Sequence, residues 1–89
     1  MDELKRHEQT QQMIDYIARE VIRRPGIEIT KETPLVSSGL MDSLALVGVL
    51  TKLEDVTSTR IPVGKVQPKD MNTVALMLAT AQRVGKPRK

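Results

Sequence analysis

Apolar residues recur at helical spacing in three segments of this chain, and no segment shows a sustained alternation of apolar and polar residues. The first segment spans residues 8–23, the second spans 43–57, and the third runs from about residue 72 to residue 83. Because side chains three or four positions apart share one helix face, each segment predicts an amphipathic helix. A short helical turn is also expected within residues 62–67. The fold class is therefore all-α, a small three- to four-helix bundle.

The predicted helices also have recognisable ends. Pro25-Gly26 stops the first helix, and Asp42 or Ser43 can cap the second. The third helix can be capped by Asn72 or Thr73. The expected core-facing residues are Met13, Ile14, Ile17, Ala18 and Val21 in the first helix, Leu46, Val49, Leu50 and Leu53 in the second, and Val74, Met77, Leu78 and Ala81 in the third.

A long connection, residues 25–42, joins the first two helices. Its Pro, Gly and Ser residues favour loops and turns. It also contains five large apolar residues, which a solvated linker would not carry, so we expect an ordered loop that packs onto the helices. Long ordered loops in compact domains are often functional. The apolar residues are Ile27, Ile29, Leu35, Val36 and Leu40.

The composition excludes several classes of function. Tyr16 is the only aromatic residue among 89, and there is no Cys. A base-stacking platform, a disulfide framework, a thiolate zinc site and a cysteine nucleophile are therefore excluded. His7 is the only His and falls in a segment expected to fray, and Glu54-Asp55 is expected to be a solvated edge. We therefore predict no catalytic centre and no metal site, and a protein that is not an enzyme.

Positive charge is concentrated near the C-terminus. Four of the 14 Lys and Arg residues lie within residues 83–89, which leaves ten basic residues against 11 acidic ones in the rest of the chain. We predict a single domain over residues 1–89, with a core over roughly 8–82 and a flexible basic tail over 83–89. The sequence shows no signal peptide and no membrane span, so a cytoplasmic monomer is expected.

One short segment, from Gly39 to Leu44, combines features that favour a modification site. Gly39 lies four residues before Ser43, Asp42 directly precedes it, and Ser43 opens the second helix. Free N–H groups and the dipole at a helix N-terminus stabilise an attached phosphate. Taken alone, the segment would equally describe a loop that ends in a helix cap.

The second helix also carries two apolar stripes. The second stripe begins beside Ser43 and consists of Leu44, Val47, Gly48 and Thr51. One apolar face is enough for a helix in a small bundle. The second stripe is therefore a candidate surface for partner proteins, or else additional core against the long loop.

Residues 37–44, with the sequence SSGLMDSL, resemble the phosphopantetheine attachment site of acyl, aminoacyl and peptidyl carrier proteins. The spacing from Asp42-Ser43-Leu44 to Leu53-Glu54 and to Ile61-Pro62 is similar to that family. Residues 68–74, PKDMNTV, look like the turn before the last helix of discrete aminoacyl carrier proteins. The resemblance covers roughly residues 8–82.

This resemblance implies that Ser43 receives a 4'-phosphopantetheine arm from coenzyme A, with motif support from Gly39, Asp42 and Leu44. The arm would carry an acyl or aminoacyl group as a thioester. The implied partners are a phosphopantetheinyl transferase, an acyl or amino acid ligase, and an acceptor transferase or synthase. The implied docking face consists of Leu44, Ala45, Val47, Gly48, Thr51 and Glu54.

The sequence departs from the fatty-acid branch of that family at several positions. The acidic residues usual along the second helix are replaced by Ala45 and Gly48, and Arg60 stands where an acid is usual. Charge steering of partners should therefore be weaker. The protein could act in fatty acid or secondary-metabolite biosynthesis. A dedicated pathway fits these departures better than the central fatty-acid cycle does. Thr57 replaces a usually aromatic core residue, which predicts looser packing there.

A second hypothesis is a non-catalytic helical adaptor, or a weak nucleic-acid-binding module that uses the basic C-terminal tail. The near-neutral body and the lack of a basic stripe argue against nucleic acid as a partner. A third hypothesis, a hydrolase with Ser43 as its nucleophile, lacks a base to activate the hydroxyl.

Overall fold

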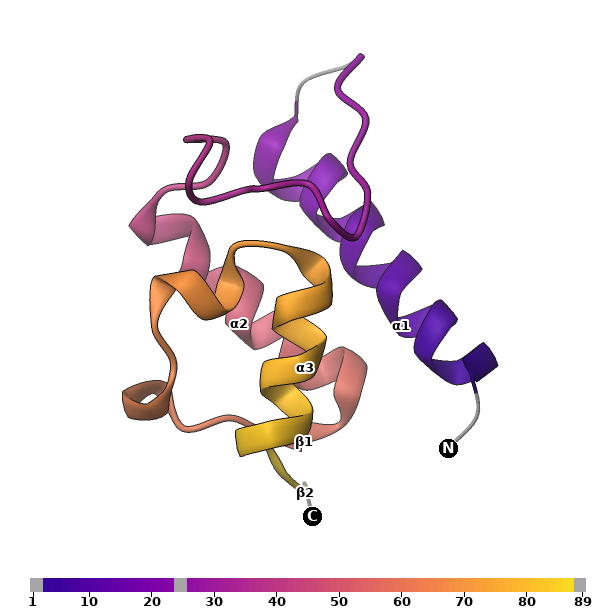
Figure 1. The fold of residues 1–89 in the computed structure, drawn as a ribbon, viewed down its shortest axis with the longest axis vertical. Coiled ribbons are helices and arrows are strands. Elements are labelled where there is room, and N and C mark those ends of the chain that lie inside the picture. Colours follow the sequence, from indigo (N-terminus) through magenta and orange to yellow (C-terminus); the bar gives the residue numbers. More distant parts are fainter. Residues whose placement is uncertain (1–2, 24–25, 88–89) are drawn as a thin grey trace.

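The computed structural model describes residues 3–23 and 26–87. Its main helices pack into the small bundle seen in Figure 1, with α1 crossing beside α2 and α3. The predicted all-α bundle with a long loop between the first two helices is confirmed. No helix in the described part of the chain is long and apolar enough to cross a membrane. The helices are α1 (Glu3–Tyr16), which continues as the π-helical η1 (Ile17–Ile22), α2 (Ser43–Thr57) and α3 (Val74–Val84).

Two short 3-10 helices lie in the connection between α2 and α3. The first, η2 (Val63–Lys65), falls within the stretch for which a helical turn was predicted. The second, η3 (Pro68–Met71), is held by reciprocal bonds. The backbone N–H of Gln67 donates to the Asp70 carboxylate at 2.9 Å, and the Asp70 N–H donates back to Gln67. This capping box stabilises the turn that leads into α3.

α1 begins at Glu3 and not at residue 8, so the predicted start is wrong, and His7 lies within a helix. Residues 3–7 are exposed, including Leu4 at 68%. They therefore lack the apolar face from which the start was inferred. Their helix propensities are nonetheless good, and Glu3 suits the positive end of the dipole. The helix ends at Ile22, and the residue that caps it, Arg23, has a left-handed φ of 57°; the predicted stop at Pro25 lies outside the described residues.

The core is built from aliphatic and Met side chains. Val49 and Leu53 of α2 are fully buried, as predicted for the core-facing stripe. Leu46 and Leu50 are half-buried at its edge. The long loop contributes Ile29, Leu35 and Met41, which confirms that it packs onto the helices. The other buried apolar residues are Met13, Ile17, Ile61, Met71, Val74, Met77, Leu78 and Ala81.

The C-terminal segment is arranged differently from the predicted tail. α3 continues through Val84, so the boundary expected at residue 83 falls inside a helix. A short strand, β2 (Lys86–Pro87), then pairs antiparallel with β1 (Thr59–Arg60), just after α2. This pairing joins segments far apart in the sequence, which helical periodicity does not reveal. The flexibility of residues 83–89 stays a prediction, and residues 88–89 lie outside the described part.

Candidate functional site

Ser43 is the first residue of α2 and is exposed to solvent. Asp42 caps the helix: its backbone is extended, and its Oδ1 accepts a hydrogen bond from the Ala45 N–H at 2.9 Å. The Ser43 hydroxyl makes no hydrogen bond with any other described residue. The hydroxyl is therefore accessible from solvent, and the cap does not depend on it.

The chain before Ser43 is a closed turn fixed at both ends. Met41 donates its N–H to the Leu35 carbonyl at 2.9 Å, and both side chains are buried. Between them, Gly39 has a φ of +84°, a conformation that L side chains rarely adopt. The backbone conformation at position 39 therefore strongly favours glycine. Together these features hold Asp42 and Ser43 at the surface immediately after a buried anchor.

Asn72, just before α3, ties this turn to the rest of the bundle. Its Oδ1 accepts hydrogen bonds from the N–H groups of Val36 at 2.8 Å and Ser37 at 2.9 Å. Its backbone carbonyl accepts from Leu35 at 2.7 Å. Three consecutive backbone donors of the loop are thus satisfied by one residue. The sequence placed Asn72 in a turn and left Asn72 or Thr73 as the helix cap. Thr73 is the cap, because it accepts from the Leu76 N–H at 3.0 Å, and the role of Asn72 in holding the loop was not predicted.

The second stripe of α2 lies on the surface and not in the core. Leu44 is 85% exposed and Val47 is 69% exposed, while Gly48 and Thr51 are also exposed. The alternative reading, that this stripe is additional core against the loop, is therefore wrong. A contiguous apolar strip that begins beside Ser43 is a feature typical of interaction surfaces.

The remaining residues of the predicted docking face are placed differently. Ala45 and Glu54 are only half-exposed. The Glu54 carboxylate accepts a hydrogen bond from the Ile61 N–H at 2.7 Å and so anchors the chain after α2. Glu54 therefore has a structural partner, and the exposed part of the face is formed by the residues nearer to Ser43.

Gly48 lies where α1 crosses α2. A Cβ added at Gly48 would be 3.4 Å from the Tyr16 hydroxyl. One turn further along α2, the Lys52 ammonium lies 5.6 Å from the centre of the Tyr16 ring, within cation–π range. The glycine thus faces an aromatic residue of its own chain, at a distance that an alanine would tolerate.

An apolar hollow of about 220 Å³ lies between α2, η2 and η3. Val47 lies at its edge, and its wall includes Leu46 and Leu50 of α2. Val63, at 72% exposure, and Val66 contribute from η2 and its flank. The first lining residues, Leu46 and Val47, lie about one helical turn along α2 from Ser43. Sequence reasoning did not find this hollow because it depends on how η2 and η3 fold against α2.

The structure is thus a small helical domain with an exposed serine at the start of a capped helix and an apolar strip beside it. A family model described as the phosphopantetheine attachment site matches residues 11–80. The chain belongs to this family and is a phosphopantetheine-carrying protein, whose 4'-phosphopantetheine is covalently bound. Neither the curated proteins nor the solved structures gave a significant match.

Proposed function

We propose that Ser43 bears the 4'-phosphopantetheine arm, and that the arm holds an acyl or aminoacyl group as a thioester. The observation that carries this proposal is the exposed hydroxyl of Ser43, which has no partner among the described residues and opens a 15-residue helix. The amide groups at that end favour a phosphodiester. The arm supplies the thiol that forms the thioester; the chain supplies the attachment point and the surface around it.

The proposed partners are those of a dedicated pathway: a phosphopantetheinyl transferase, an acyl or amino acid ligase, and an acceptor transferase or synthase. Leu44 and Val47 support this role because they expose apolar surface beside the attachment point. Holding the cargo on a tether raises its effective concentration at the next enzyme. We propose that the protein acts as a monomer, which leaves this strip free for partners in succession.

We further propose that the protein carries out no catalysis of its own. His7 is the only imidazole, and the cavity that it lines is not lined by Ser43. His7 is therefore not placed to act as the base that would activate the Ser43 hydroxyl. The transfer reactions would be supplied by the partner enzymes.

The test is the intact mass of the protein after incubation with coenzyme A and a broad-specificity phosphopantetheinyl transferase. Wild type should gain one phosphopantetheine and Ser43→Ala should gain none. Ser37→Ala is the matched control, because Ser37 is an exposed serine of the preceding turn. Modification of Ser43→Ala, or no modification of folded wild type whose Ser43 is free beforehand, would refute the assignment.

The apolar hollow supports a cargo with an apolar portion. Its walls come from aliphatic residues of α2, η2 and η3, which match a short hydrocarbon better than a charged group. Loading the arm with a butyryl group should shift the backbone amide resonances of Leu46, Val66 and Met71, while loading with glycine should not. Identical spectra for the two cargoes would place the cargo in solvent.

A further inference from the structure

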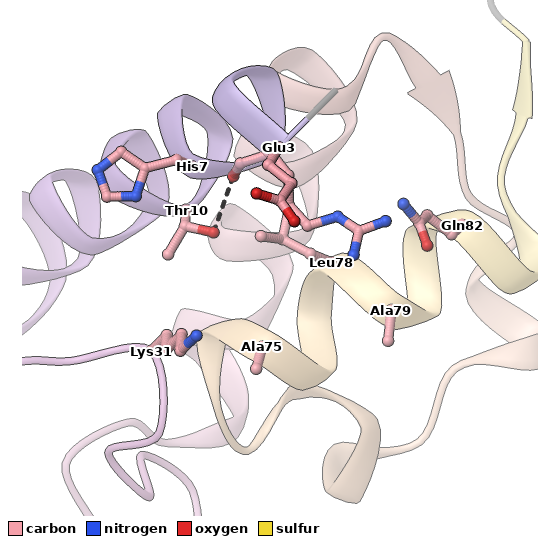
Figure 2. Close-up of a pocket in the computed structure, with 9 residues that line it drawn as sticks. Glu3, His7, Thr10, Lys31, Ala75, Leu78, Ala79 and Gln82 are labelled. Atoms are coloured by element: carbon pink, nitrogen blue, oxygen red, sulfur yellow. Dashed lines mark hydrogen bonds between the residues drawn. The ribbon is translucent and has the colours of Figure 1, made fainter. Parts of the chain in front are cut away.

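A groove separates the N-terminal half of α1 from α3, and Figure 2 shows side chains from both helices facing it. The cavity measures about 440 Å³. Its α3 wall includes two small residues, Ala75 and Ala79, and one larger apolar residue, Leu78. An adjoining hollow of about 150 Å³ shares Leu78 and extends the groove toward Thr57 and Thr59. The small side chains of Ala75 and Ala79 leave part of the space between the two helices unfilled.

Two cationic side chains and one acidic side chain line this groove. The cations are Arg6 of α1 and Lys31 of the long loop, and the acid is Glu3; His7 also lines the cavity. The side chains of Arg6 and Lys31 form no ion pair with other described residues. The two cations and Glu3 give the lining a net charge of +1, whereas residues 1–82 carry ten basic and 11 acidic residues. The groove therefore offers two solvent-exposed cationic side chains beside the small apolar residues of α3.

We propose that this groove binds an acidic segment of a partner protein. Carboxylates of the segment would face Arg6 and Lys31, and an apolar side chain between them would enter the space over Ala75 and Ala79. Arg recognises carboxylates through paired donors, and complementary charge sets the specificity of an interface. A peptide fits better than a uniformly charged polyanion, because the apolar wall of α3 can receive an apolar side chain of the peptide.

The groove is separate from the surface around Ser43. No residue between 32 and 56 lines either of its two hollows. Figure 1 places the start of α1 at the lower right of the bundle, whereas α2 begins toward the upper left. A partner bound here would leave the Ser43 hydroxyl and the exposed strip of α2 accessible. The site would thus hold the protein beside one constant partner while successive enzymes act at Ser43; binding itself does not depend on the assignment of Ser43.

The probe is an acetylated, amidated peptide of repeated Glu-Glu-Leu triplets, titrated into isotope-labelled protein and followed by two-dimensional NMR. The peptide should perturb the amide resonances of Arg6, Lys31, Ala75 and Ala79. The double variant Arg6→Glu/Lys31→Glu should bind about tenfold more weakly, since two attractive contacts become repulsive. The matched control is Lys65→Glu/Lys69→Glu, which reverses two exposed lysines outside the groove and should bind as wild type does.

Four further measurements make the proposal refutable. Arg6→Gln/Lys31→Gln removes the charges without reversing them, and far-UV circular dichroism of each variant checks folding. Ser43→Ala should bind the peptide normally, and the groove variants should accept phosphopantetheine normally, so this proposal and the Ser43 assignment fail separately. Perturbations confined to α2, equal binding by the groove and control variants, or preferential binding to a single-stranded oligonucleotide or to phosphatidylglycerol vesicles would overturn the proposal.

Discussion

At the scale of single residues, Asn72 has more influence than its place in a turn suggests. We predict that Asn72→Ala lowers the free energy of unfolding by about 2 kcal/mol, because the Val36 and Ser37 N–H groups lose their acceptor. Asn72→Asp keeps an acceptor oxygen and should lose less. Urea denaturation followed by circular dichroism measures both. Equal losses for the two variants would show that the acceptor is not what stabilises the turn.

Gly48 is a residue whose replacement should stabilise the protein. Gly48→Ala is expected to raise the free energy of unfolding by up to about 1 kcal/mol, the difference in helix propensity. The added Cβ would make an ordinary contact with the Tyr16 hydroxyl, 3.4 Å away. Gly39→Ala is the contrasting control, and it should cost about 1–2 kcal/mol because Gly39 has a φ of +84°. Thermal unfolding of both variants is the measurement. If Gly48→Ala is destabilised, the added Cβ clashes with Tyr16 and α1 does not shift to relieve the clash.

At the scale of secondary-structure elements, the cap of α2 separates two roles of the attachment motif. Asp42→Ala should lower the free energy of unfolding by about 1 kcal/mol, since the Ala45 N–H loses its partner. Asp42→Asn keeps the cap and should be nearly as stable as wild type. The rates of phosphopantetheine transfer to these two variants then separate the contribution of the Asp42 negative charge from that of the helix cap. If Asp42→Asn is as unstable as Asp42→Ala, the cap is not the source of stability.

The exposed strip of α2 gives a second prediction at this scale. Val47→Asp should change the free energy of unfolding by less than about 0.5 kcal/mol, because Val47 is 69% exposed. Modification by the transferase should nonetheless slow severalfold, because docking would bury this side chain. Leu4→Asp, at a similarly exposed leucine of α1, is the control and should be modified at the wild-type rate. Equal rates for both variants would remove Val47 from the docking face.

The elements that sequence reasoning located well are those with local signals. Asp42 and Ser43 mark the start of α2, and the apolar stripe containing Val49 and Leu53 marks its buried face, so its bounds agree with the structure. The start of α1 was missed because an exposed first turn around Leu4 has no periodic pattern. Asp42 and Ser43 were likewise predictable as a cap and a surface hydroxyl, since both roles depend on a few adjacent residues.

At the scale of the whole molecule, features that join distant segments could not be predicted. The basic groove needs α1, the long loop and α3 together, so Arg6 and Lys31 are 25 positions apart in sequence yet line one cavity. The pairing of Thr59–Arg60 with Lys86–Pro87 has the same origin. No periodicity reports such contacts, because they follow from how the helices pack.

That strand pairing can be tested through Gly85, which connects α3 to β2. A Cβ added there would overlap the carbonyl oxygen of Ala81 and press against Thr59. Gly85→Ala should therefore cost about 1–3 kcal/mol and weaken the hydrogen-exchange protection of the strand. A change below about 0.5 kcal/mol would favour the flexible tail expected from the sequence.

The Tyr16 ring has a consequence for how this protein can be observed. It lies half-buried between α1 and α2, beside the Lys52 ammonium, and the chain contains no Trp and no second Tyr. The intrinsic ultraviolet fluorescence of the polypeptide therefore comes from this one side chain. Changes in emission intensity or lifetime therefore report on the α1–α2 crossing. The protein has an intrinsic fluorescent probe of that crossing and needs no attached dye.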